Sequence, residues 1–265
     1  MFVCHRFRFS FKHFRWFSFL LFLYLSLPVT YSVAGENLNY MVIEEQAAPF
    51  QIKDDSERSS GIISDFLFKI LDNSPHQIQV NSFPFKRMVK VINAGLYPNW
   101  ITYGSSKWSA PQNLNLSDCS ILTVKHVLLS PKENKLNFNG IDSLLGKRIV
   151  LLFGFEYPQL DKYMKTEEIL ELRVKKYDSA FKALELERGI GFVEMESRIK
   201  YNLKQAGRKI EDYDLIDLTS IIPRYDIRFS LAPNMPESIK TYIDDQCKQL
   251  KHSGELERIV NRYLD

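Results

Sequence analysis

Apolar positions follow two alternating spacings through residues 35–265, and these spacings predict strands and helices in turn. Short apolar runs typical of strands occur at 39–44, 77–81, 99–103, 123–129, 148–153, 192–195, 214–218 and 227–231. Apolar residues spaced along one helix face predict helices at 61–72, 84–95, 141–145, 179–188, 197–206, 236–250 and 253–263. This alternation favours an α/β architecture with mainly parallel sheets.

The first 34 residues have the composition of an export signal. A basic stretch that ends at Arg15 precedes an apolar stretch, 16–29, which is shorter than the roughly 20 residues that a membrane-spanning helix needs. Ser32 and Ala34 supply the small residues that a signal peptidase requires, so we expect cleavage near Ala34 and a mature protein in the periplasm. The alternative is an uncleaved membrane anchor.

The positive net charge of the chain comes from this segment. The whole sequence has 35 Lys and Arg against 32 Asp and Glu, and removing the four basic residues of 1–34 leaves 31 against 32, a net charge near −1. A mature chain so close to neutrality gives no support to a nucleic acid or an anionic membrane as partner.

The remaining histidines and cysteines form no metal-binding motif. His76, His126 and His252 have spacings that match no zinc site, and no serine is flanked by glycines as a nucleophile would be. We therefore expect no metal, no cofactor and no enzymatic activity, with a hydrolase or lyase on the same fold as the alternative. For Cys119 and Cys247, a disulfide and two buried free thiols both remain open.

Five local stretches, in their order along the chain, resemble the family 3 periplasmic solute-binding proteins that serve amino-acid uptake. They are a loop after the first strand at 48–50, a helix start at 61–65, a step into a second lobe at 141–150, a helix end at 183–192 and a closing helix at 255–263. The resemblance covers nearly all of 35–265. It implies the two-lobed periplasmic binding protein fold of type II, with a hinge between the lobes.

The resemblance also implies domain boundaries and a function. Residues 1–34 would be the signal peptide, 35–126 and 225–265 the first lobe, and 127–224 the second lobe. A monomer of this kind would capture a small polar solute between its lobes for the permease of an ABC transporter. The alternative is a periplasmic sensory module that presents its ligand-bound state to a membrane signalling partner.

Position relative to the predicted strands nominates the ligand-binding residues, because loops at the carboxyl ends of strands line such clefts. Aromatic residues and one cation qualify in the first lobe, and a strand-to-helix turn and a carboxylate qualify in the second. The candidates are Phe50, Trp100, Tyr103, Lys107, Trp108, Gly154, Phe155 and Glu194. The alternatives are capping of the core for Phe50, surface packing of a long loop for the candidates at 100–108, ordinary helix initiation for the turn and plain exposure for the carboxylate.

One position departs from the family pattern. Amino-acid-binding members carry an arginine shortly before a serine-aspartate pair, and counting back from Ser117 and Asp118 places Ala110 there. Alanine cannot grip a carboxylate with two parallel hydrogen bonds, and Lys107 offers only a point charge. We therefore expect a site of aromatic surface and scattered carboxylates, which favours cationic or weakly acidic ligands over simple amino acids.

Overall fold

The structure, a computed structural model, describes residues 1–3, 35–53 and 58–265 of the chain. The chain divides into two units, 1–34 and 35–265, and every element described below belongs to the second. The predicted export signal lies outside the described residues except for its first three.

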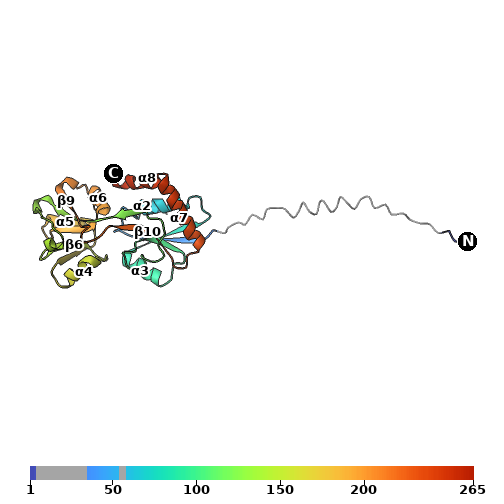
Figure 1. The fold of residues 1–265 in the computed structure, drawn as a ribbon, viewed down its shortest axis with the longest axis horizontal. Helices are drawn as coiled ribbons and strands as arrows, with labels where there is room; N and C mark the ends of the chain where they lie inside the picture. The colour runs from blue at the N-terminus through green and yellow to red at the C-terminus, as the bar shows by residue number, and fades with distance from the viewer. Residues whose placement is uncertain (4–34, 54–57) are drawn as a thin grey trace. The chain divides into compact units, whose positions relative to one another are not determined.

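Residues 35–265 form two mixed five-stranded sheets, each with helices packed against it (Figure 1). The first sheet has the order β2-β1-β3-β10-β4, in which β1 runs parallel to β2 and β3 while β10 runs antiparallel to β3 and β4. Its strands are β1 Asn37–Ile43, β2 Gln77–Phe83, β3 Trp100–Gly104, β4 Leu122–Val124 and β10 Tyr225–Leu231.

The second sheet has the order β7-β6-β8-β5-β9. Strand β6 runs parallel to β7 and β8, and β5 runs antiparallel to β8 and β9. Its strands are β5 His126–Pro131, β6 Arg148–Leu152, β7 Leu170–Val174, β8 Gly191–Met195 and β9 Tyr213–Asp217. The chain therefore enters this sheet at Lys125 and leaves it between Asp217 and Tyr225.

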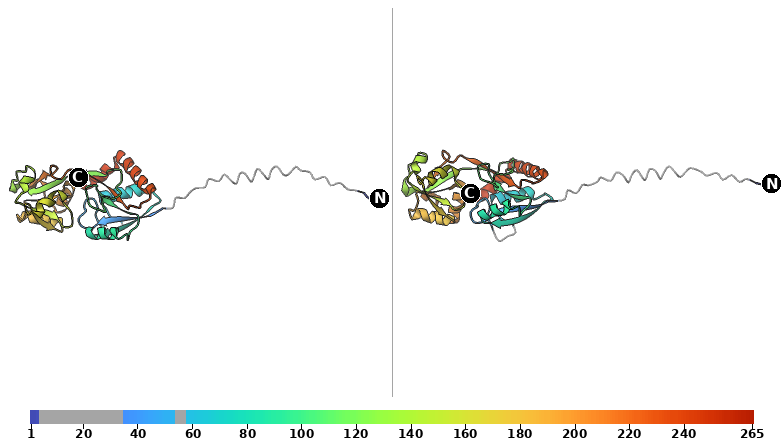
Figure 2. Two further views of the ribbon diagram at one scale, coloured as in Figure 1. Left: turned by 60° about the horizontal axis from the view of Figure 1, so that its bottom comes forward. Right: turned by 90° about the horizontal axis from the view of Figure 1, so that it is seen from below.

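The helices divide between the two sheets in the same way. Helices α2 Ile62–Leu71, α3 Phe85–Asn93, α7 Glu237–His252 and α8 Glu255–Leu264 belong with the first sheet, and together they make what we call the first lobe. The second lobe is the second sheet with α4 Pro158–Lys165, α5 Tyr177–Glu185 and α6 Glu196–Gln205. Both views in Figure 2 show the red C-terminal helices beside the blue and cyan N-terminal elements. Among the described residues, no helix combines the length and the apolar character needed to cross a membrane.

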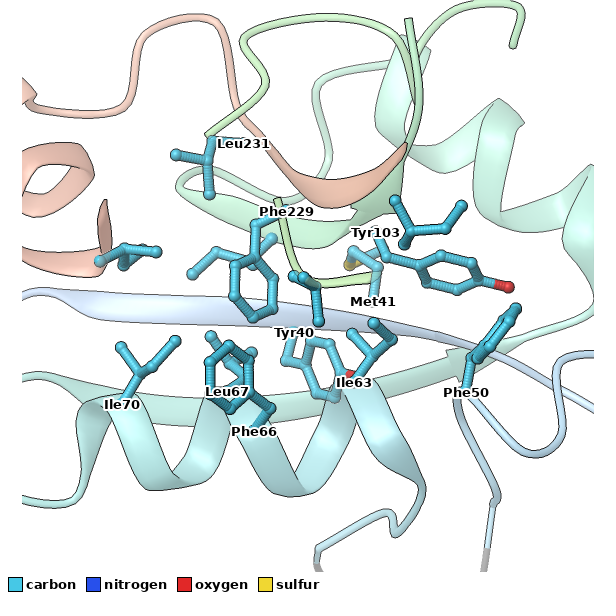
Figure 3. Close-up of a cluster of buried hydrophobic side chains, with 14 of the residues drawn as sticks. Tyr40, Met41, Phe50, Ile63, Phe66, Leu67, Ile70, Tyr103, Phe229 and Leu231 are labelled. Carbon is cyan, nitrogen blue, oxygen red and sulfur yellow. The ribbon is translucent and has the colours of Figure 1, made fainter. Parts of the chain in front are cut away.

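Helix α2 anchors the core of the first lobe. Its apolar face packs against β1 and β10, with the ring of Phe66 stacked on that of Phe229 at 6.2 Å between centroids (Figure 3). The first amides of the helix donate to the preceding loop, from Ile62 N to the Pro49 carbonyl and from Ile63 N to the Phe50 carbonyl, both at 2.8 Å. These bonds satisfy amides that a helix start would otherwise leave unpaired, so they hold the loop against the core.

Gly61 makes this close approach between loop and helix feasible. Its φ is +111°, which L side chains rarely adopt, and a Cβ there would lie 2.6 Å from the Phe50 carbonyl oxygen. The loop and the helix therefore touch backbone to backbone.

The structure confirms the α/β fold class and differs from the predicted elements in several places. The sheets are mixed and not mainly parallel, because β10 and β5 run antiparallel to their neighbours. Helix α4 was not among the predicted helices, and the helix predicted at 141–145 is a 3-10 helix, Ile141–Leu144. The run 123–129 is two strands, because the chain changes sheets at Lys125. Strand β7 was not predicted, because it is an edge strand whose sequence, Leu-Glu-Leu-Arg-Val, is partly exposed and half polar.

A disulfide joins Cys119, just before β4, to Cys247 in α7. Asp244, one turn earlier in α7, accepts a hydrogen bond from the Cys119 amide at 3.0 Å. The bridge spans 128 positions and so encloses the whole second lobe in one covalent loop. Closing so long a loop removes much conformational entropy from the unfolded chain.

Replacing both Cys119 and Cys247 by serine should lower the free energy of unfolding by about 2–4 kcal/mol, since the unfolded chain regains that entropy. Denaturant unfolding with and without a reducing agent measures the change. The reducing agent should destabilise the unaltered protein and leave the double variant unchanged. Equal midpoints for the two proteins under oxidising conditions would contradict the assigned role of the bridge.

Candidate functional site

A cavity of about 340 Å³ lies between the two lobes. The first lobe contributes the end of β1, part of α3, Tyr103 of β3, the loop that follows β3, and Tyr225 at the start of β10. The second lobe contributes His126 of β5, the loop after β6, the end of β8 and one residue of α6. The volume is at the lower end of the range for small-molecule sites.

Six of the eight predicted ligand-binding residues line this cavity. They are Tyr103, Lys107 and Trp108 from the first lobe and Gly154, Phe155 and Glu194 from the second. Ala110, where the family pattern would place an arginine, lines it as well. These six residues are thus brought together at one cavity, and their role in ligand binding stays a prediction.

Phe50 and Trp100 lie in the core of the first lobe instead. Phe50 is 0% exposed, because the backbone contacts with α2 turn its loop inward and its ring packs edge-on against Tyr103 (Figure 3). Trp100 is 4% exposed, because it begins a strand whose residues are all buried. Neither residue lines the cavity. The core alternative describes Phe50, whereas Trp100 is a buried strand residue and lies neither in the cavity wall nor in a surface loop.

Aromatic rings form much of the cavity wall. Trp108 meets Tyr103 and Tyr225 edge-on, at 5.6 and 6.1 Å between centroids, and its Nε1 donates to the Tyr225 hydroxyl at 3.1 Å. Phe85 of α3 stacks on Phe155 of the second lobe, 5.3 Å apart with an angle of 4° between ring planes. The stacked pair joins the two lobes beside the cavity.

The most deeply buried charge at the cavity is Arg198, which sequence reasoning missed. It lies in α6 and is 1% exposed. Its Nη2 donates to the Tyr103 hydroxyl of the first lobe at 2.8 Å, and its Nη1 lies 3.7 Å from Glu194 Oε1. The guanidinium carbon also lies 5.1 Å from the ring centre of Phe50 and 5.2 Å from that of Phe155, within cation–π range. Arg198 therefore contacts both lobes.

Glu194 is the partner that compensates this buried charge. It is 3% exposed, at the end of β8, and its Oε1 accepts a hydrogen bond from the Met195 amide at 2.7 Å. The Tyr177 hydroxyl donates to its Oε2 at 3.4 Å. Burial raises the pKa of Glu194 above its ordinary value, while Arg198 and the Met195 amide oppose that rise. Its carboxylate is thus already engaged within the protein.

His126 lies at the start of β5, where the chain has just entered the second lobe. It is 7% exposed, and its Nδ1 is buried with no hydrogen-bond partner among the described residues. Burial, helped by the charge of Arg198, lowers the pKa of His126 to about 4. The imidazole is therefore neutral at pH 7.

The charges around the cavity differ from those expected from sequence. Within the described part of the chain, four cations line it against two carboxylates, namely Lys86, Lys90, Lys107 and Arg198 against Glu156 and Glu194. Glu156, on the second lobe, accepts a hydrogen bond from Ser109 Oγ of the first lobe at 2.6 Å. The cavity is thus a basic one with a buried arginine, which removes the basis for expecting cationic ligands.

The described residues include no group of three or more His, Cys, Asp and Glu side chains that could hold a metal ion. The chemistry of the cavity is that of aromatic surface, hydrogen bonds and charge. Such a lining suits the recognition of a small molecule.

No protein-family model matches this sequence, and no curated protein is significantly similar to it. Solved structures do resemble it. An ABC uptake transporter substrate-binding protein from Streptococcus pneumoniae, with bound histidine, matches over 86% of this chain and 92% of its own, with a TM-score of 0.67 and 12% identity. The GluR0 ligand-binding core from Nostoc punctiforme, in complex with L-glutamate, matches over 86% and 99%, with a TM-score of 0.65 and 18% identity.

A third similar structure is the ancestral amino-acid-binding protein AncCDT-1, a precursor of cyclohexadienyl dehydratase. It matches over 86% of this chain and 96% of its own, with a TM-score of 0.66 and 14% identity. Similarity at such low identity shows the fold. The chain therefore has the two-lobed α/β fold of these binding proteins, which confirms the predicted fold and, at that level, the resemblance to family 3 solute-binding proteins.

Removing one partner of the buried pair should be costly. Arg198→Met leaves Glu194 buried without its cation and should lower the free energy of unfolding by about 3–5 kcal/mol. Adding Glu194→Gln to that variant should restore part of the loss. Denaturant unfolding of the two single variants and the double variant measures the coupling.

Lys200→Met is the matched control, because Lys200 pairs with Glu196 on the same helix, at 2.9 Å, with 43% of its side chain exposed. An exposed pair contributes less than about 1 kcal/mol. Equal losses for the Arg198 and Lys200 variants would contradict a stabilising buried pair.

The low pKa of His126 predicts a pH dependence of stability. In the unfolded chain its imidazole binds a proton near the ordinary pKa of 6.5, whereas the folded protein binds that proton only near pH 4. Stability is therefore lost as the pH falls from about 6.5 towards 4. Between pH 7 and 4.5 the unaltered protein should lose about 2 kcal/mol more than His126→Gln. Parallel losses in the two proteins, measured by denaturant unfolding, would contradict this assignment.

Proposed function

We propose that the protein is an exported solute-binding protein that captures a small polar solute between two lobes and delivers it to an ABC-type uptake system. The observation that carries the proposal is the cavity itself, because both lobes supply aromatic and charged residues to it. A ligand there contacts both lobes at once, and such contacts stabilise a closed arrangement.

The proposed moving parts are the first lobe, 35–126 with 225–265, and the second lobe, 127–224. The two connections between them are the step at Lys125 and the segment between Asp217 and Tyr225. The first connection is a single residue, and the second contains a turn in which the Ile221 and Ile222 amides donate to the Leu218 carbonyl. Short connections of this kind suit hinge bending. The contact of Ser109 with Glu156 between the lobes is polar and solvent-accessible, so it can open at low cost, whereas the Arg198–Tyr103 hydrogen bond and the Phe85–Phe155 stack favour the closed arrangement.

Transport is supported by one of the similar structures, the substrate-binding protein of an ABC uptake transporter. Export to the periplasm is supported by the composition of 1–34 and by the disulfide, since disulfides persist in oxidising compartments. We propose that the protein acts as a monomer and catalyses no reaction. The low pKa of His126 supports the absence of catalysis, because an imidazole with that pKa is poorly suited to general acid–base catalysis at neutral pH.

The test is ligand-induced closure. Mass spectrometry of small molecules released from the purified protein identifies a ligand, and adding that ligand back should raise the melting temperature and reduce the radius of gyration in solution scattering. No ligand-dependent change in either measurement would contradict the proposal.

Trp108→Ala should weaken binding of that ligand by about 1–3 kcal/mol, because an aromatic anchor of the cavity is removed. The control is Tyr242→Ala, since Tyr242 is a partly buried aromatic of α7 that does not line the cavity. Isothermal titration calorimetry gives both dissociation constants. Equal affinities for the Trp108 variant and the unaltered protein would show that the aromatic wall does not contact the ligand.

A further inference from the structure

The carboxylates of the cavity are already bound within the protein. Glu194 holds Arg198, the Met195 amide and Tyr177, and Glu156 accepts from Ser109. A ligand ammonium at Glu194 would have to displace these partners in a buried place. Glu156 keeps free lone pairs, but it is exposed, and an exposed ion pair contributes less than about 1 kcal/mol. Among the described residues of the lining, no buried carboxylate is therefore left to receive an amino group.

The buried cation, in contrast, has donors to spare. A guanidinium has five N–H donors, and within the described part of the chain that of Arg198 makes one hydrogen bond, from Nη2 to Tyr103. The 3.7 Å from Nη1 to Glu194 is longer than a hydrogen bond, and Nε has no partner among the described residues. Buried polar atoms are nearly always hydrogen-bonded, so an under-bonded arginine beside a cavity is suited to an incoming anion.

His126 adds a second unsatisfied group to the same cavity. Its buried Nδ1 has no partner among the described residues, and the neutral ring can donate one hydrogen bond without adding charge. A carboxylate has two oxygens with several lone pairs, enough to accept from a guanidinium and from an imidazole together.

The remaining wall is apolar and flat. The Phe85–Phe155 stack and the cluster of Tyr103, Trp108 and Tyr225 offer ring faces and edges to a planar body. The cavity of about 340 Å³ limits that body to a small one. Three exposed lysines at the cavity, Lys86, Lys90 and Lys107, would draw an anion towards it.

We infer that the cavity binds a small monocarboxylic acid with a flat apolar body and no free amino group. Arg198 and His126 would donate hydrogen bonds to its carboxylate. The inference rests on the proposed function and narrows its ligand class. The expected orientation places the carboxylate at Arg198 and the apolar body against the aromatic wall.

Four compounds with the same phenyl group and chain length test the ligand class. They are 3-phenylpropanoate, its neutral amide, 3-phenylpropylamine and L-phenylalanine, titrated into the purified protein by calorimetry. The acid should bind at least tenfold more tightly than each of the other three. Its affinity should also fall as salt is raised, because the lysines attract it through charge.

Two variants test the residues. Arg198→Lys keeps the buried charge and loses the planar fork, so it should weaken binding of the acid more than tenfold and leave the weak binding of the amide unchanged. Lys107→Met, at an exposed position, should leave folding intact and reduce the salt dependence of acid binding. Lys200→Met, an exposed lysine away from the cavity, is the control and should change neither.

The outcomes separate this inference from the proposed function. If the amine or the amino acid binds as tightly as the acid, or if no acid binds and the ligand released from the protein is not an acid, the inference is overturned and the binding function stands. If no compound binds and none is released from the protein, both fail.

Discussion

The arrangement of the two lobes around the cavity depends on the buried guanidinium of Arg198 and its contacts with the first lobe. Arg198 comes from the second lobe, and its hydrogen bond to Tyr103 and its ring contact with Phe50 both reach into the first. Removing a charge from water costs several kcal/mol, and Glu194 offsets that cost from within the second lobe. The second lobe therefore positions the arginine, and the guanidinium contacts Tyr103 and Phe50 of the first lobe.

The chain reaches this geometry because it crosses between the sheets twice, at two points that are far apart in sequence and close together in space. His126 begins the first strand of the second lobe and Tyr225 begins the strand that returns to the first, and their rings lie 5.8 Å apart. The cavity therefore sits beside both connections. The disulfide from Cys119 to Cys247 lies on the first-lobe side, where it ties the segment before the crossing to α7 and leaves the crossings themselves unrestrained.

Local signals in the sequence predicted part of the cavity lining for a physical reason. Tyr103 and Trp108 were predicted because they lie at and after the end of a strand, and strand ends are where a cleft forms. Phe50 satisfies the same rule but does not line the cavity, because its loop is held by α2 through backbone bonds that no side-chain pattern reveals. Arg198 could not be predicted, since its partners Tyr103 and Phe50 lie about 100 and 150 positions away and meet it only after the lobes come together. Its spacing of four from Glu194 was a signal that was available and unused.

The same contact bears on how closure would depend on a ligand. The ion pair with Glu194 lies within one lobe and would persist if the lobes parted, whereas the contacts with Tyr103 and Phe50 would be lost. Closure would then transfer the arginine from water to an interior in which its Nε has no hydrogen-bond partner among the described residues, and that transfer would oppose closure. An acid bound at the guanidinium would supply the missing acceptors and remove the opposing cost. In the function that we propose, the empty protein would favour parted lobes and the loaded protein closed ones, a difference that an uptake system can recognise.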